Sequence, residues 1–102
     1  MYLIEVFLPV NDNDGLKQPG HLFGDVRKEL VRQFGGMTAF TRSPATGIWD
    51  GAENGRREDE IVIYEVMADT LDRTWWKAYK ADLEKRFRQD ELVIRSSELD
   101  LL

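Results

Sequence analysis

Two stretches of the chain repeat their side-chain pattern every second residue, as β-strands do. Residues 2–8 are rich in β-branched and aromatic side chains and stop at Pro9, which has no backbone N–H to donate to a neighbouring strand. Residues 60–68 are the clearer stretch, and both of its faces contain large apolar side chains. One face carries Val62, Tyr64, Val66 and Ala68, and the other carries Ile61, Ile63, Glu65 and Met67. Both stretches are therefore predicted to be strands.

Two other stretches place their apolar residues at helical spacing. Between residues 22 and 34 the apolar positions lie within about 120° of one another on a helical wheel. The glycine pair at 35–36 then ends this helix, because glycine adopts the left-handed cap conformation without a steric penalty. A second helix follows, with Asp69 or Thr70 as its cap and Asp72 in its first turn. Its predicted buried stripe consists of Trp75, Trp76, Tyr79, Leu83 and Phe87.

The remaining strands have weaker patterns. Residues 37–42 resemble a strand, residues 43–47 interrupt it, and residues 48–50 resume it before a turn at Asn54 and Gly55. This interruption predicts a bulge or excursion in one long edge strand. Residues 92–95 form the last predicted strand, and the residues after them form a short tail.

The order strand, helix, strand, strand, helix, strand matches the ferredoxin-like βαββαβ topology. We therefore predict one α+β domain over residues 1–102, with a four-stranded antiparallel sheet in the order 4-1-3-2 and two helices on one face. The opposite face of the two central strands contains five large apolar residues, which is more than a sheet normally exposes to water. We expect a second subunit, or a ligand, to cover it. These five residues are Leu3, Phe7, Ile61, Ile63 and Met67.

Composition and charge narrow the classes of function. The 102 residues are 42% hydrophobic and 32% charged, as in one globular domain. The formal net charge of −5 argues against nucleic acid as a partner. The absence of cysteine excludes disulfides and thiolate metal sites, and the apolar runs are shorter than the roughly 20 residues needed to cross a bilayer. We expect a cytoplasmic protein without a membrane partner.

A pair of acidic residues is the sharpest candidate site. Glu5 and Glu65 are predicted to lie on the same face of adjacent central strands. Two neighbouring carboxylates raise the pKa of one of them, and they can serve as acid and base or as metal ligands. The alternatives are pairing with Arg42 or Arg95 from neighbouring strands, or simple exposure to water.

Other candidates are isolated residues with one structural and one functional interpretation each. His21 is the only histidine, which excludes a two-histidine metal site within one chain, and it is either a surface residue near the helix start or a general base. Trp49 either lines a pocket mouth or anchors the edge strand. No phosphate loop, nucleophile elbow or catalytic triad spacing is present, so no cofactor and no metal is expected. The predicted ligand-binding residues are Phe7, Arg42, Trp49, Ile63 and Arg95.

Two resemblances to known families add to this interpretation. The element order and the half-apolar open sheet resemble the dimeric α/β-barrel superfamily, which includes antibiotic-biosynthesis monooxygenases, but no matching catalytic set is present to carry over. The chain is also similar to an uncharacterised family of short bacterial proteins, and this similarity implies a fold without implying a reaction. It rests on Phe34-Gly35-Gly36-Met37-Thr38, Gly47-Ile48-Trp49, residues 60–65 and Phe87-Arg88-Gln89.

Two classes of function therefore remain in view. The first is a homodimeric domain that binds a small-molecule ligand or a protein partner through its sheet face. The second is a cofactor-independent small enzyme, monooxygenase-like or isomerase-like, in which Glu5, Glu65, His21 or an arginine assists proton transfer.

Overall fold

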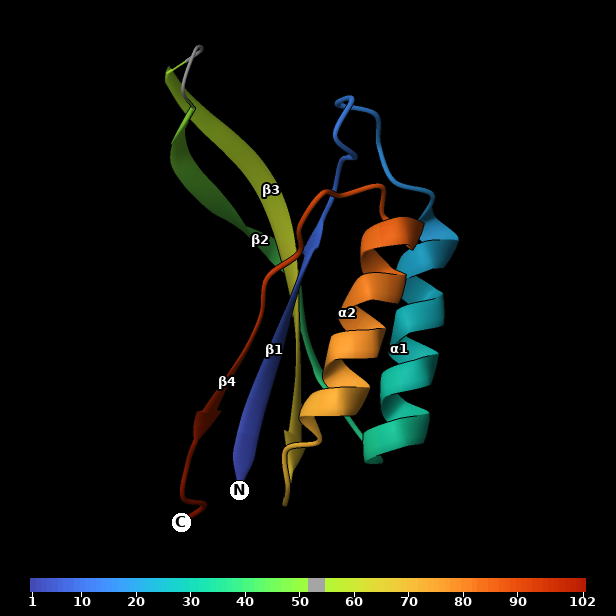
Figure 1. Ribbon diagram of the computed structural model, residues 1–102, viewed down its shortest axis with the longest axis vertical. Helices are drawn as coiled ribbons and strands as arrows, with labels where there is room; N and C mark the ends of the chain where they lie inside the picture. The colour runs from blue at the N-terminus through green and yellow to red at the C-terminus, as the bar shows by residue number, and fades with distance from the viewer. Residues whose placement is uncertain (52–54) are drawn as a thin grey trace.

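The computed structural model describes the backbone of residues 1–51 and 55–102 and the side chains of residues 1–40 and 61–102. In this part of the chain, strands and helices follow one another in the predicted order (Figure 1). They are β1 (Tyr2–Pro9), α1 (Gly20–Phe34), β2 (Thr38–Gly51), β3 (Gly55–Ala68), α2 (Arg73–Arg86) and β4 (Ile94–Glu98).

The strands form one antiparallel sheet in the order β2-β3-β1-β4. This is the predicted order 4-1-3-2 counted from the opposite edge, so the ferredoxin-like α+β fold is confirmed. Both helices lie on the same side of the sheet (Figure 1). No helix in the described residues has the length and apolar character required to cross a membrane.

The core lies between the sheet and the two helices. Even-numbered residues of β1 and β3 point into it, as the alternation of side chains predicted, and Val6 and Tyr64 are fully buried. Leu83 of α2 is also fully buried, and Trp76 is 7% exposed. Burying a large apolar side chain contributes about 1.5–3 kcal/mol, so these positions hold the helices on the sheet. Trp75, which the sequence also placed in the buried stripe, is only half-buried, because adjacent residues on a helix point about 100° apart.

The two helices differ in how well their ends were predicted. Gly35 ends α1 with φ 82°, and its N–H donates to the Val31 carbonyl, as expected for a glycine cap. The predicted caps of α2 were wrong, because Asp72 is the N-cap and its carboxylate accepts a hydrogen bond of 3.0 Å from the Trp75 N–H. Leu71 precedes this cap and packs against the core, which fixes where the chain turns into the helix.

The strands differ most from prediction at their ends, and β3 begins at Gly55 rather than at residue 60. β2 is one strand whose pairing with β3 shifts between Phe40 and Ala45, which agrees with the predicted bulge. β4 begins at Ile94 and ends at Glu98, so assigning residues 96–98 to a tail was wrong. Their backbone pairs with β1, and an edge strand needs no apolar pattern for that. Leu92 is buried before the strand begins.

Candidate functional site

The helix-free side of the sheet carries a charged row inside an apolar border. Glu5 is paired with Arg95 on one side and with Glu65 on the other, and Glu65 is paired in turn with Thr38. These four residues therefore cross the sheet from edge to edge; we call them the polar row. Side chains alternate along each strand, so Ser97 flanks Arg95 on β4, whereas the flanking positions on the other three strands are apolar. They are Leu3, Phe7, Phe40, Ile61, Ile63 and Met67.

An ion pair occupies one end of the polar row. The Arg95 Nε donates to Glu5 Oε1 at 2.9 Å, and the guanidinium carbon lies 4.7 Å from the centre of the Phe7 ring. The Glu5 side chain is 19% exposed and that of Arg95 is 62% exposed. Of the alternatives that the sequence left open for Glu5, the structure contains the pairing with Arg95.

The second acid of the row has a different environment. Partial burial raises the pKa of Glu65 above its ordinary value, and the charge of Glu5 and a hydrogen bond between the two side chains raise this pKa further. No basic partner of Glu65 occurs among the described side chains. The two glutamates therefore differ: Glu5 accepts the hydrogen bond of the ion pair with Arg95, and Glu65 binds a proton more tightly than an ordinary glutamate does.

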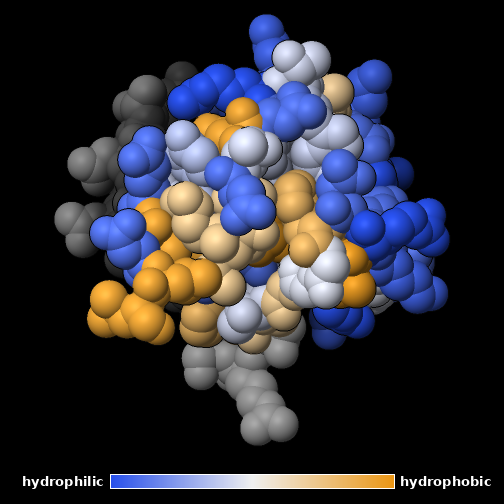
Figure 2. Space-filling model, turned by 90° about the horizontal axis from the view of Figure 1, so that it is seen from below, coloured by the Kyte–Doolittle hydropathy of each residue, from blue (hydrophilic) through white to orange (hydrophobic). Residues whose placement is uncertain are grey.

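Glu65 also lines a hollow of about 400 Å³. The hollow lies where β1, β3 and the segment after α1 meet, and Leu3, Met37, Thr38 and Met67 line it with Glu65. The glycine pair at 35–36 forms part of its wall and places no side chain in it. Figure 2 shows the end of the molecule at which α1 finishes, where apolar side chains gather among hydrophilic ones. The sequence contained these residues, but only the fold brings the segment after α1 to Glu65.

The other predicted site residues fall into three groups. Phe7 and Ile63 face each other across β1 and β3 and lie beside the polar row, as predicted. His21 is exposed in the first turn of α1 and lines a separate hollow of about 340 Å³ together with Lys17 and Arg86. The hollow at Glu65 lies at the other end of this helix, so His21 does not join the acid pair. The side chains of Arg42 and Trp49 lie outside the described residues.

In residues 1–40 and 61–102, no group of three acidic or histidine side chains is placed to hold a metal ion. The acid pair itself offers two carboxyl groups that face each other across β1 and β3. One carboxyl group is available as a donor or acceptor beside an apolar hollow.

These features define a ferredoxin-like α+β domain with an acid pair on its open sheet face. No protein-family model matches the chain, and no curated protein matches it. Among solved structures, the chain is similar to a phage SAM lyase in complex with S-methyl-5′-thioadenosine, with a TM-score of 0.61 and 13% identity. The match covers 95% of this chain and 80% of that chain. At this level of identity the likeness supports the fold alone, and the resemblances to the dimeric α/β-barrel superfamily and to the short bacterial family stay predictions.

Proposed function

We propose that this chain is a binding domain that pairs with a second copy through the helix-free face of its sheet. The observation that carries the proposal is the polar row inside its apolar border. Met67 and Phe40 are 48% and 46% exposed on that face. Exposed apolar side chains on both sides of the polar row make this face a candidate interaction site.

The charges of the polar row favour a second copy as the occupant. Arg95 lies on the edge strand β4, and Glu65 lies two strands away on β3. A two-fold axis parallel to the strands, running between the two faces above Glu5, places Arg95 of each copy opposite Glu65 of the other. The apolar borders then meet each other. Such an interface is self-complementary, as two-fold symmetry requires.

The size of the face sets the expected strength of this pairing. Strands lie about 4.8 Å apart and rise about 3.3 Å per residue, so about eight residues from each of three strands and the five residues of β4 cover about 460 Å². Two copies would bury about 900 Å², which is close to the lower limit of specific interfaces. An interface of this size is typical of weak or transient association, so we expect a reversible dimer that forms at high protein concentration.

The experiment that tests the proposal is sedimentation velocity over a range of protein concentrations. The wild-type mass should rise toward that of a dimer as concentration increases, whereas Met67→Lys should stay monomeric because it places a charge in the apolar border. Val31→Lys is the matched control, since Val31 is 46% exposed on α1 and Met67 is 48% exposed on the sheet. A wild-type protein that stays monomeric at hundreds of micromolar, or equal disruption by both variants, would refute the proposal.

Reversal of the row's charges adds a more specific test. Arg95→Glu should weaken the dimer by placing like charges opposite each other, and Arg95→Glu combined with Glu65→Arg should restore it. Restoration requires that the two positions face each other across the interface. If the double variant associates no better than the single one, the two-fold arrangement is wrong.

The hollow at Glu65 favours a second candidate function, a small enzyme that uses this carboxyl group as an acid or base. A raised carboxyl pKa beside an apolar hollow is a feature of catalytic sites. The phage SAM lyase of similar fold holds S-methyl-5′-thioadenosine. Adding S-methyl-5′-thioadenosine to the isotope-labelled protein and recording its amide NMR spectrum tests this second candidate function. Amide shifts at Thr38 and Met67 that disappear in Glu65→Gln would support it, and a spectrum without shifts would contradict it.

A further inference from the structure

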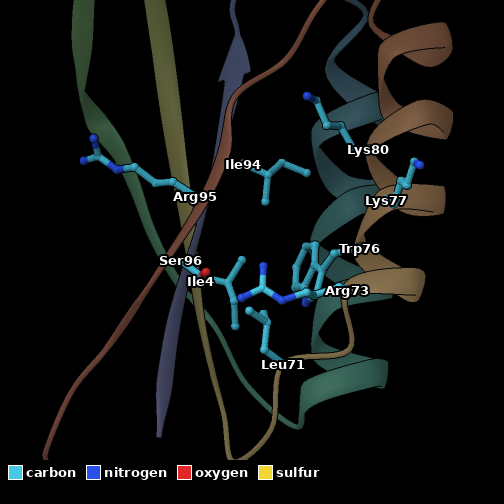
Figure 3. A pocket seen from close by; sticks show the side chains of 9 residues that line it. All are labelled: Ile4, Leu71, Arg73, Trp76, Lys77, Lys80, Ile94, Arg95 and Ser96. Carbon is cyan, nitrogen blue, oxygen red and sulfur yellow. The ribbon is translucent and has the colours of Figure 1, made fainter.

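A groove between α2 and β4 lies on the helix side of the sheet, away from the polar row (Figure 3). It encloses about 230 Å³. The groove forms because β4 is an edge strand that pairs only with β1, so the sheet extends past the helix that covers its centre. Its lining comes from α2, β4, β1 and the residue before the α2 cap. The lining residues are Ile4, Leu71, Arg73, Trp76, Lys77, Lys80, Ile94, Arg95 and Ser96.

The inner wall of the groove is apolar and rigid. Ile4 is 1% exposed and Trp76 is 7% exposed, and both belong to the core. Ile94 is half-buried and packs against that core from β4. Figure 3 shows Trp76 and Ile94 extending into the groove from opposite sides. The Arg95 side chain points to the other face of the sheet, where it binds Glu5.

The outer wall is basic. Arg73, Lys77 and Lys80 follow one another at intervals of four and three residues on α2, which places them on one side of the helix. Figure 3 shows the Arg73 side chain extending across the groove toward Ile4 and Ser96. This concentration of positive charge occurs in a chain whose formal net charge is −5. The local charge is therefore opposite in sign to that of the whole molecule.

The acidic groups near the groove have other partners or are remote from Arg73. Glu91 lies 3.5 Å from the Lys80 ammonium, but its side chain is 79% exposed. Asp72 accepts the capping hydrogen bond from Trp75. Glu98 accepts a hydrogen bond of 3.2 Å from the Tyr2 hydroxyl. Among the described side chains, neither Arg73 nor Lys77 makes an ion pair.

From this combination we infer that the α2–β4 groove binds a small carboxylate with a flat apolar body. The Arg73 guanidinium matches the planar geometry of a carboxylate, and Lys77 and Lys80 add favourable potential. Trp76 and Ile94 contact the apolar body. The volume is below the roughly 300–1,000 Å³ of ordinary ligand pockets, so it suits a single ring rather than a nucleotide. This site is independent of pairing through the open sheet face.

Two-dimensional NMR titration of the labelled full chain tests the inference with three defined probes. Benzoate has the ring and the carboxylate, benzyl alcohol has the ring without the charge, and acetate has the charge without the ring. Benzoate should shift the Trp76 indole signal and the amides of Ile94 and Ser96 at millimolar concentration. It should bind at least about tenfold more tightly than either of the other probes, because only benzoate uses both walls.

Paired variants of exposed arginines locate the binding. Arg73→Gln should weaken benzoate binding about tenfold, because it removes the charged fork. Arg32→Gln, an exposed arginine in the last turn of α1, should leave the affinity unchanged. Any one of three results would overturn the inference: no shift at the groove, equal binding of benzoate and acetate, or equal affinity in Arg73→Gln and the wild type.

Discussion

Replacing one acid of the polar row by its neutral amide should make the protein more stable at neutral pH. In Glu65→Gln the shape of the side chain is kept and its charge is removed. Glu65 lies directly opposite Glu5 in the pairing of β3 with β1, and Glu65 has no basic partner among the described side chains. The wild type therefore holds two adjacent negative charges on this face once Glu65 loses its proton.

The size of the effect follows from the separation of the charges. Side chains directly opposite each other on antiparallel strands lie about 5 Å apart, and two like charges at that distance repel by about 0.8 kcal/mol in water and by about 3 kcal/mol at an effective dielectric constant of about 20. Arg95 neutralises part of the Glu5 charge, and solvent reaches the half-buried Glu65. We therefore expect a gain of about 0.5–1 kcal/mol in the free energy of unfolding at pH 7.

The gain should depend on pH with a defined sign. The pKa of Glu65 is raised in the folded state above the ordinary value of 4.5, so the folded state holds this proton more tightly than the unfolded chain does. The stability that this provides is complete below the ordinary pKa and is lost as pH rises through the raised value. The difference between Glu65→Gln and the wild type should therefore be near zero or negative at about pH 4 and should become positive toward pH 7.

Urea denaturation followed by tryptophan fluorescence, repeated across this pH range, measures the difference. It should be done at two protein concentrations, because dimer formation would add a concentration-dependent stability. Glu91→Gln is the control, since the Glu91 side chain is 79% exposed and forms, within residues 1–40 and 61–102, a single 3.5 Å ion pair with Lys80. A Glu65→Gln protein that is less stable at pH 7, or a gain that does not change with pH, would refute the reasoning.

Two further predictions concern the framework that carries the site. Leu83→Ala should lower the free energy of unfolding by about 2–5 kcal/mol, because Leu83 is fully buried. Val31→Ala should lower it far less, because Val31 is 46% exposed. Equal losses of stability in urea denaturation would show that Leu83 is not part of the core. Gly35→Ala should cost about 1 kcal/mol, because Gly35 has φ 82°, and Gly36→Ala should cost less, because Gly36 has no positive φ and open space at its Cβ position. Equal melting temperatures for these two variants would contradict this account of the α1 end.

The sequence predicted well those elements whose side chains face the core. In β1 and β3 one face is wholly apolar and the other carries a central glutamate, and this difference set the register within the sheet, since a shift by one residue would have exchanged the buried and open faces. The same register placed Glu5 opposite Glu65, so the acid pair was predictable from two strands alone. The end of α1 was predictable because the conformation at Gly35 requires a residue without a Cβ penalty.

Elements decided by backbone pairing were predicted less well. β4 contains mostly polar, exposed residues, and its extent is set by hydrogen bonds to β1 rather than by an apolar pattern. The cap of α2 was misplaced because several acidic and hydroxyl residues precede the helix and all can cap. Packing of Leu71 against the core selects Asp72 among them.

The chain by itself determined the order of the elements, the buried and open sides of the central strands, and the presence of two acids on the open side, because all of these follow from local periodicity. Only the tertiary structure decided that Arg95 forms the ion pair with Glu5 and that the segment after α1 forms a hollow beside Glu65. It also decided that the basic side of α2 faces an apolar groove at β4. Each of these depends on how far one element extends past another, and that distance is set by packing of the whole core rather than by any stretch of sequence.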